Sequence, residues 1–458
     1  MKKTLSTMML ATILNGCATT ENPNSQTASL SWGEITQQEG IDINGNQIRL
    51  TADSGQFTAK VFQGRKPVKL ANIEVEQLPV WDNWQAVDKI VPAEAKDAPV
   101  FVPVSDGNYW LLARYAKSPK TGYHAWHSTN MKDWTHHGPI STHDNRWVTS
   151  AEYKDGQFYI YFDKPNDEDP HLIIDDDLTD GKQGKVVGKV FEDPTHGSDM
   201  AIFRNDDGNF HLIYEDWSPV DPSKHAWDSP LAGHADSPDG INGFEPHEYE
   251  PPIDVRTTPT GKILPYKPHP NQMEFGKDPY PYVYQEHQGP QDAFGDYTLI
   301  KVGDHYYLFC DYDPADKSKS MRVGRWRSDN INKQFVWDGE VGAGFHPDPT
   351  VGFAEGKFYL LVQRAGNDYI SDGPWIDGVQ ARAGVDIDND GKIDQWTEFA
   401  NIKETYQQKS GFVRVVEKKP ASIDVTSLPA GYSYSVEFKL SQHNQLKPVI
   451  THLKTHIK

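Results

Sequence analysis

The chain has few cysteines, few basic residues and no long apolar run beyond its start. Among 458 residues there are only two cysteines, Cys17 and Cys310, so a scaffold held together by several disulfides is excluded. Lysine and arginine number 45 against 65 acidic residues, which gives a net charge of −20. A nucleic-acid partner is therefore not expected, because binding to phosphates requires a basic surface. After the first few tens of residues, no apolar run is long enough to span a membrane.

The start of the chain has the pattern of a secretion signal. A short apolar stretch from Leu5 to Leu14 follows two lysines and is too brief to cross a bilayer. The residues up to Cys17 resemble a bacterial lipobox, which implies a lipidated cysteine. Because Ala18 rather than an aspartate follows, the resemblance implies anchoring in the outer membrane. An ordinary signal peptide of a secreted protein is the alternative. Cys310 closes an apolar run and is expected to be a buried structural thiol.

Tryptophan, tyrosine and phenylalanine are abundant, at 12% of the chain, and they recur in a repeated pattern. An acidic residue and a glycine precede a run rich in aromatic and β-branched residues in segments 106–112, 155–161, 207–213, 303–309 and 355–361. Such a turn between two apolar runs is typical of a β-hairpin. Aromatic and β-branched residues favour strands over helices.

A second signature follows two of these hairpins. Residues 125–134 and 234–240 each predict a third strand, a turn and a fourth strand. Four strands per unit, repeated at intervals of roughly 50 residues, are typical of propeller blades. The sequence therefore predicts an all-β, five-bladed β-propeller. Six or seven blades stay open, because residues 40–95 and 410–445 also contain strand-like stretches that could complete a blade or form an added unit. Val80 to Ile90 is one weak candidate for a helix.

These observations divide the chain into five expected segments. They are a lipoprotein signal peptide at 1–17, a polar tether at 18–31, an N-terminal segment that packs on the propeller at 32–95, the propeller at 96–405, and C-terminal strands that close or flank it at 406–458. Residues 217–289 break the repeat with a long stretch rich in proline, histidine and aspartate. Long ordered loops are often functional.

Several of these motifs resemble a known group of enzymes. Asp97 to Val100, together with the hairpin that follows, is similar to the first blade of five-bladed glycosidases, and so is the segment 128–134. Residues 198–203 are similar to a later blade. The resemblance covers about residues 95–400. It points to glycoside hydrolase families 43 and 117, which act on arabinans, xylans and agar oligosaccharides.

Four of the five blades carry an acidic residue at a similar place. About eight or nine residues before the hairpin turn stand Asp97, Asp199, Asp296 and Asp348, whereas the second blade has Trp147 and Thr149 in this region. In a propeller, the innermost strand of each blade starts near one mouth of the central channel. We therefore expect a ring of carboxylates around one cavity.

Converging carboxylates repel one another, so their pKa values should separate. Glycoside hydrolysis needs such a separation, with one group protonated and another ionised. The resemblance implies inversion, with Asp97 as the general base and Asp199 as the residue that orients the acid and tunes its pKa. It places the acid at Asp296 or Glu286. In family 117 the acid can be a histidine, and His287 stands beside Glu286.

Further residues are candidates for binding substrate. Asp348 completes the ring of acids. His124 and His143 lie in a histidine-rich part of the first blade. Trp126 offers an aromatic face for a sugar ring, and Arg204 suits a carboxylate or sulfate. His287 is a substrate contact if it is not the acid.

An acidic segment near residue 390 matches the calcium-loop pattern. The expected ligands are Asp386, Asp388, Asp390 and Asp394, with Gly391 at the sharp turn. Hard oxygen ligands at this spacing favour a structural calcium ion, and a solvated acidic turn is the alternative. Calcium is the only cofactor that the sequence suggests.

The sequence thus favours a secreted hydrolase that cleaves oligosaccharides from plant or marine algal cell walls, with a poly- or oligosaccharide as its partner. One alternative is a polysaccharide lyase or dehydratase that acts on uronic acid residues, for example in ulvan. It would use Tyr123, His124 or His143, and Arg204 for β-elimination. The other alternative is a surface glycan-binding lipoprotein without turnover.

Overall fold

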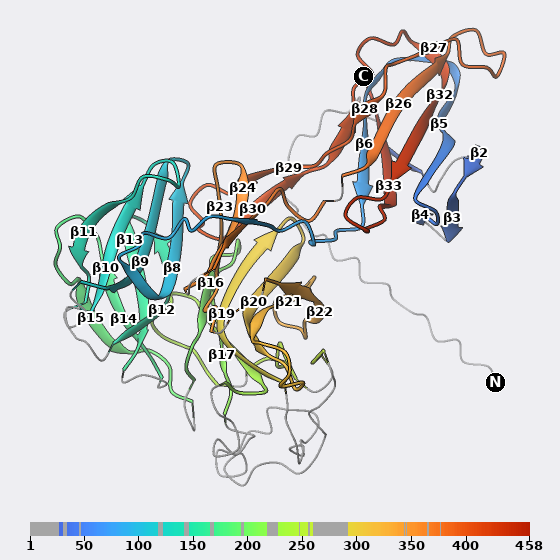
Figure 1. The fold of residues 1–458 in the computed structure, drawn as a ribbon. Helices are drawn as coiled ribbons and strands as arrows, with labels where there is room; N and C mark the ends of the chain where they lie inside the picture. Colours follow the sequence, from blue (N-terminus) through green and yellow to red (C-terminus); the bar gives the residue numbers. More distant parts are fainter. Residues whose placement is uncertain are drawn as a thin grey trace, which may run out of the picture.

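The computed structural model describes residues 27–30, 34–44, 47–117, 122–141, 146–164, 169–193, 197–217, 228–246, 248–254, 257–259, 292–342, 344, 346–363, 366–375 and 377–458. Within these ranges every regular element is a β-strand, which confirms the expected all-β class. The same residues contain no helix that is long and apolar enough to span a membrane. The strands form two units, a propeller and a smaller β-sandwich beside it (Figure 1).

Each of the first three blades is an antiparallel sheet whose strands follow chain order from the centre outwards. Blade 1 consists of β8 (Ala95–Ser105), β9 (Asn108–Tyr115), β10 (Tyr123–Ser128) and β11 (Thr135–Pro139). Blade 2 consists of β12 (Trp147–Lys154), β13 (Gln157–Asp163), β14 (Pro170–Asp175) and β15 (Lys185–Lys189). Blade 3 has three described strands, β16 (Ala201–Arg204), β17 (Phe210–Glu215) and β18 (Ala232–Ser237).

The last two blades include strands from distant parts of the chain. Blade 4 consists of β19 (Ala293–Val302), β20 (His305–Asp313), β21 (Arg322–Ser328) and β22 (Val336–Val341). To its inner edge are added β30 (Val415–Lys419) and β29 (Thr405–Gln408). Blade 5 consists of β23 (Thr350–Ala354), β24 (Lys357–Leu361), β25 (Asp368–Ser371) and, on its outer edge, β7 (Gln85–Val87).

The expected helix at 80–90 is therefore wrong, because this segment supplies the outer strand of blade 5. The buried carboxylate of Asp368 holds it there. That carboxylate accepts the backbone N–H groups of Ile90 and Val91 and lies 2.8 Å from the Lys89 ammonium. A strand that pairs across the propeller in this way satisfies its hydrogen bonds with the sheet rather than within a helix. It also joins the start of the propeller to its last blade.

Five apolar clusters close the ring of blades. Each lies between two neighbouring sheets, and the fifth joins blade 5 to blade 1 through Tyr359 and Leu361 against Phe101 and Tyr109. The other four lie between blades 1 and 2, 2 and 3, 3 and 4, and 4 and 5. The aromatic residues of the repeat supply much of this packing, since a large ring buries more apolar surface than most side chains. The predicted five blades are confirmed.

The hairpin turns of the repeat follow from their sequence. Asp155 and Gly156 both have positive φ, at 51° and 85°, and so have Glu355 and Gly356, at 50° and 71°. Two consecutive positive φ values are typical of the type I′ turn, whose twist matches that of the flanking strands. All five predicted hairpins are present.

The second unit is a β-sandwich built from both ends of the described chain. One sheet contains β1 (Thr27–Leu30), β3 (Ile41–Asn44), β4 (Gln47–Leu50), β6 (Leu70–Gln77), β31 (Ala421–Ile423) and β33 (Val449–Ile457). The other contains β2 (Ile35–Glu39), β5 (Ser54–Val68), β26 (Val379–Asp386), β27 (Gln395–Trp396), β28 (Ala400–Asn401) and β32 (Gly431–Ser441).

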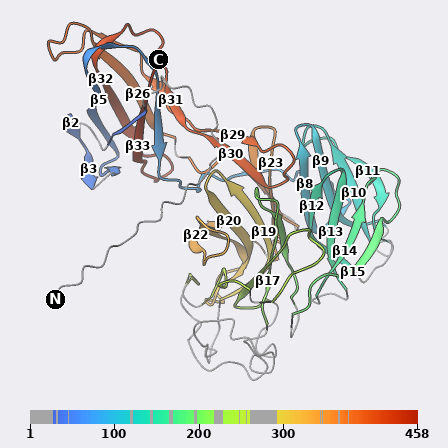
Figure 2. The same ribbon diagram turned by 180° about the vertical axis from the view of Figure 1, so that it is seen from behind.

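The sandwich changes the expected division of the chain. Residues 379–401 lie in its sheets rather than in the propeller, and residues 85–87 lie in the propeller rather than in an N-terminal segment. Phe57, Val436 and Phe438 are among the residues of a separate apolar core between its two sheets. Between the two units the chain passes through β29 and β30, which Figure 2 shows from behind.

Candidate active site

Four acids begin the innermost strands of four blades in the same unusual backbone conformation. Asp97, Asp199, Asp296 and Asp348 all have positive φ, at 65°, 46°, 52° and 39°. In blades 1 and 4 a β-bulge surrounds the acid, and in blade 2 the corresponding bulge holds Thr149. Aspartate tolerates this left-handed region better than most residues do, and a bulge redirects a side chain. The repeated conformation shows that the acids occupy equivalent places.

A second tier of polar residues lies at the same end of the second strands. Arg114 pairs with the residue before Asp97, Asp163 pairs with Trp147, and Asp311 pairs with Gly295. In blade 3 the Glu215 N–H donates to Ser198, and in blade 5 the Gln363 N–H donates to Pro347. Every blade thus presents one residue from its inner strand and one from its second strand to the same end of the propeller.

Asp97 forms an ion pair with a cation of its own blade. The Nε atom of Arg114 lies 3.0 Å from its Oδ2 atom. The Arg114 guanidinium also lies 4.1 Å from the centre of the Trp147 ring, in cation–π contact. The Asp97 side chain is 29% exposed, so solvent reaches it. A partly exposed carboxylate beside a fixed guanidinium is favoured in its ionised form.

Tyr123 lies behind this pair. It is fully buried, and burial together with the charges of Asp97, Asp348 and Asp296 raises its pKa well above the ordinary value. Each of the three acids is therefore close enough to Tyr123 to influence its pKa, because electrostatic effects fall off with distance. The raised pKa favours the neutral phenol.

Asp296 is the inner acid with a strongly raised pKa. Burial is the largest cause, followed by the charges of Asp348 and Asp228. The neighbouring Asp311 is fully buried, and its pKa is also raised well above normal, by burial and then by Asp348 and Asp296. A carboxyl surrounded by other carboxyls takes up a proton more readily than one in water. The surroundings of Asp296 and Asp311 thus favour their protonated forms, whereas Asp97 lies beside a guanidinium.

Asp311 and Asp348 also approach a histidine. Asp311 accepts the Asp348 N–H at 2.8 Å, and its other oxygen lies 3.9 Å from Nδ1 of His346. One ligand atom from each of these three residues lies within 4.8 Å of the others. Within the described ranges, this is the group at the ring whose atoms are close enough to share a metal ion.

Glu215 is a buried acid that the charges of both Asp199 and Asp296 influence. It is 2% exposed, and burial followed by the charges of Asp199, Asp228 and Asp296 raises its pKa well above normal. Its Oε2 atom accepts the indole N–H of Trp217 at 2.9 Å. The Glu215 carboxyl is thus held by Trp217 and is close enough to the blade 3 and blade 4 acids to be influenced by their charges.

Gly295 leaves the space that Glu215 occupies. A Cβ atom on this glycine would clash with Oε1 of Glu215 and lie 2.8 Å from Oδ1 of Asp228. Gly295→Ala is expected to displace Glu215, to destabilise the fold by about 1–3 kcal/mol, and to lower activity. The matched control is Gly344→Ala, where a Cβ atom meets nothing within 4 Å. Activity and a urea unfolding curve of both variants test this, and equal behaviour of the two would contradict it.

The raised pKa of Asp311 also predicts a pH dependence of stability. The folded state holds this proton to higher pH than the unfolded chain, whose carboxyl titrates near the ordinary value of 3.8. Stability from the protonated form is present below that value and is lost as pH rises through the folded pKa. Asp311→Asn cannot ionise, so it should gain stability relative to the natural protein as pH rises. The raised pKa of Asp311 would be refuted if the difference in unfolding free energy between Asp311→Asn and the natural protein did not change with pH, or changed in the opposite direction.

The structure places His124 and Trp126 among side chains that pack blade 1. Both lie on β10, on the same face as expected, with ring centres 6.3 Å apart. Nδ1 of His124 lies 2.8 Å from Nε2 of His136, and burial lowers the pKa of His124 to about 4. Trp126 is 2% exposed in the cluster between blades 1 and 5. These side chains pack the outer part of the blade.

Arg204 is separated from the acids. It ends β16, about 16 Å along the strand direction from Asp199 at 3.3 Å per residue. Its guanidinium donates to the Gly411 carbonyl and lies 4.3 Å from the centre of the Phe412 ring. It contacts the segment before β30.

Four sequence candidates lie outside the described residues. They are Cys17, His143, Glu286 and His287. Their expected roles stay predictions. Glu215, Asp311 and Asp163 are residues of the ring that the sequence argument missed, although a signal was present. In blades 1, 2, 3 and 5 the second-tier residue is the seventh after the hairpin glycine.

The acidic loop near residue 390 belongs to the sandwich, at the end of β26. Ligand atoms of Asp386, Asp388 and Asp394 lie within 4.8 Å of one another, and Asp390 is not in this group. The Asp390 carboxylate instead accepts the Lys392 N–H at 2.8 Å. Three carboxylates so close repel one another unless a cation lies between them. Calcium binding here stays a prediction.

Removal of calcium tests that prediction. If the loop binds the ion, millimolar calcium should raise the melting temperature of the protein after chelation, because a ligand of the folded state stabilises it by about 2.7 kcal/mol at 100 times its Kd. Asp388→Asn should weaken the response. The same response in this variant would contradict the assignment to this loop.

Comparisons with known proteins find distant structural likenesses. No family model and no curated protein matches the chain. An endo-arabinase from Bacteroides thetaiotaomicron is 9% identical, with a TM-score of 0.43, and the match covers 63% of this chain and 96% of that one. An exo-1,5-α-L-arabinanase from a bovine ruminal metagenomic library is 16% identical, with a TM-score of 0.39, over 66% of this chain and 97% of that one.

A thermostable family-43 glycoside hydrolase is 11% identical, with a TM-score of 0.39, over 77% of this chain and 98% of that one. All three TM-scores are below 0.5, so nothing about this chain is concluded from the likeness. The resemblance to family 43 in the sequence stays a prediction, and so does the resemblance to family 117.

Proposed function

We propose that the chain is a glycoside hydrolase acting on oligosaccharides derived from plant or marine algal cell-wall polysaccharide. The observation that carries the proposal is that two inner acids, Asp97 and Asp296, have opposite electrostatic surroundings. Asp97 has a guanidinium 3.0 Å away, and Asp296 is crowded by other carboxyls that raise its pKa. One ionised and one protonated carboxyl are the pair that glycosidic hydrolysis requires.

In the proposed reaction, water attacks the anomeric carbon with inversion. Asp97 accepts a proton from this water as the new carbon–oxygen bond forms. Asp296 donates its proton to the leaving oxygen as the glycosidic bond breaks. The Asp199 carbonyl accepts the N–H of Tyr297 at 3.1 Å, next to Asp296 in the chain. Asp199 is thus a positioning residue for the acid, and its charge acts on the same Glu215 that Asp296 influences.

The arrangement of the ring favours hydrolysis over elimination from a uronic acid. Elimination needs a cation to neutralise the substrate carboxylate and a base beside the neighbouring proton. His124 and Arg204 contact other parts of their blades, and Tyr123 is buried with a raised pKa. A uronate at the ring would also face several carboxylates, with Arg114 and His346 as nearby basic groups. A neutral sugar avoids that repulsion.

A product assay tests the proposal. Arabino-, xylo- and agar oligosaccharides, the substrates implied by the sequence resemblance, are incubated with the full chain and with Asp296→Asn. The expected products carry the mass of added water and show no new ultraviolet absorbance. An unsaturated product would favour the lyase, and binding without any product would favour a glycan-binding protein. Lipidation of Cys17 and an outer-membrane location stay part of the proposal.

A further inference from the structure

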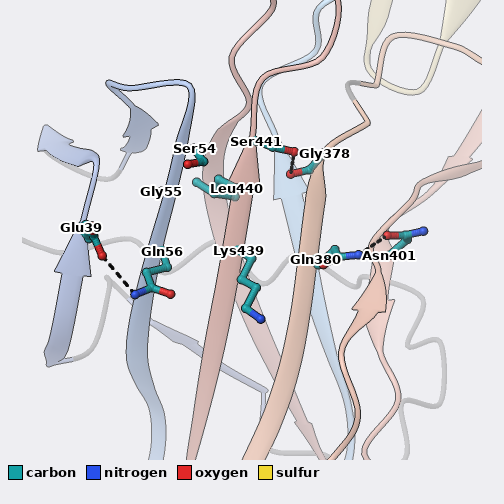
Figure 3. A pocket seen from close by; sticks show the side chains of 10 residues that line it. All are labelled: Glu39, Ser54, Gly55, Gln56, Gly378, Gln380, Asn401, Lys439, Leu440 and Ser441. Carbon is teal, nitrogen blue, oxygen red and sulfur yellow. Dashed lines mark hydrogen bonds between the residues drawn. The ribbon is translucent and has the colours of Figure 1, made fainter.

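The outer face of one sandwich sheet carries a groove that is separate from the ring. Its volume is about 480 Å³, within the usual range for small-molecule sites. Figure 3 shows side chains from β2, β5, β32, β26 and β28 lining it. The lining residues are Glu39, Ser54, Gly55, Gln56, Gly378, Gln380, Asn401, Lys439, Leu440 and Ser441.

Five of these residues form one row across five strands. Strand pairing places Glu39 beside Gln56, Gln56 beside Lys439, Lys439 beside Gln380, and Gln380 beside Asn401. Their side chains lie on the face opposite the apolar core, because side chains alternate along each strand. At about 4.8 Å per strand, the row is about 19 Å long. The sheet therefore presents a straight polar track rather than a single polar spot.

The row contains three side-chain amides, one carboxylate and one ammonium, and the hydroxyls of Ser54 and Ser441 line the groove beside it. The Gln380 amide donates to Asn401 Oδ1 at 3.0 Å, and the Gln56 amide donates to Glu39 Oε2 at 3.3 Å. Each amide retains further donor or acceptor capacity, since a side-chain amide has two N–H donors and an oxygen with two lone pairs. Adjacent donors and acceptors of this kind match the hydroxyl groups of a sugar.

The charges of the groove balance. It has one acid and one base, and the ammonium of Lys439 lies 3.9 Å from the centre of the Phe399 ring. The nearby Arg382 is paired with Glu437, with Nε 2.7 Å from Oε2. A polyanion would therefore find little net positive charge here, and the whole chain carries −20. A neutral ligand fits these groups better.

We infer that this groove binds a neutral oligosaccharide, namely a stretch of the same polymer that the ring cleaves. The inference rests on the proposed function for the identity of the polymer, but the groove is a binding site without a catalytic role. Its place on the second unit lets a long chain contact the protein at two points. Two linked contacts raise the apparent affinity for a long chain without changing that for a short one.

Titration calorimetry on the full chain tests the inference. The protein carries Asp97→Asn, and the probes are linear arabino- and xylo-oligosaccharides and their polymers. We expect two sites per chain, of which Gln380→Ala with Asn401→Ala removes or weakens one by about tenfold or more. The matched control is Lys454→Met, on the other sheet, compared with Lys439→Met in the groove. Unchanged binding in the double variant would overturn the inference.

Two further readouts separate the groove from the ring. With Asp97 restored, the groove variants should hydrolyse a trisaccharide as fast as the natural protein but should act more slowly on the polymer at low concentration. If no glycan is hydrolysed yet the groove variants still lose binding, the proposed hydrolysis fails and the groove site stands. A large loss of binding at high salt would contradict the inference that the ligand is neutral, because salt strongly screens only interactions between charged groups.

Discussion

Asp97→Asn should lower kcat on the cleaved oligosaccharide by about 10²–10⁴-fold, the usual contribution of a general acid or base. The amide cannot accept a proton from the attacking water, although it keeps the shape of the side chain. Binding should be little changed, because the amide can still face the Arg114 guanidinium that now lies 3.0 Å from the carboxylate. The measurement is a steady-state assay with a binding titration on the same variant.

Two controls make this result specific. Asp368→Asn changes a buried acid of blade 5 that holds the outer strand, so it should affect unfolding rather than the chemical step. Azide supplied to Asp97→Asn should restore some turnover if the missing group is a base. An Asp97→Asn variant with natural kcat would remove Asp97 from the mechanism.

Arg414→Met should be the most destabilising single change outside the ring, at about 3–5 kcal/mol. Arg414 is 2% exposed and enters the centre of the propeller just before β30. Its guanidinium donates to the carbonyls of Phe101 in blade 1 and Ala151 in blade 2, at 2.8 and 2.7 Å, and lies 3.2 Å from the Glu152 carboxylate. Its own carbonyl accepts the N–H of Lys301 in blade 4. One residue therefore joins three blades.

Arg414→Met should lose stability mostly because the buried Glu152 carboxylate is left without its cation. Burial already raises the pKa of Glu152, while Arg414 and Arg204 lower it. Adding Glu152→Gln to Arg414→Met should therefore recover part of the loss, as seen in urea unfolding midpoints. The exposed pair of Lys117 and Glu94 gives the comparison, since Lys117→Met should change stability little. No loss in Arg414→Met, or no recovery in the double variant, would contradict this role.

The propeller and the inner acids were predictable because their signals are local. An Asp-Gly turn between apolar runs determines a hairpin over about a dozen residues. The acids recur at a near-constant distance before those turns, so Asp199 and Asp348 could be found without any knowledge of their neighbours. Glu215 and Asp311 also have regular positions after the turns, but their place near the inner acids depends on the tertiary structure, such as the β-bulge opposite Asp311.

The sandwich was not predictable as a unit because its pairings are long-range. Phe57 of β5 pairs with Phe438 of β32, and the two residues are separated by nearly the whole propeller. Local propensity shows such strands but not their partners. The packing contacts of Trp126 and Arg204 could not be predicted for a related reason. Aromatic and basic side chains that suit a sugar also suit the packing between blades, and only the tertiary structure distinguishes the two.

The most direct test of the account is hydrolysis in water labelled with heavy oxygen. If carboxyls from separate blades act as base and acid, the label should enter the anomeric position of the product, with inverted configuration at the start of the reaction. Asp97→Asn and Asp296→Asn should each abolish this incorporation. Unsaturated products without label, or labelled products that both variants form at the natural rate, would contradict it.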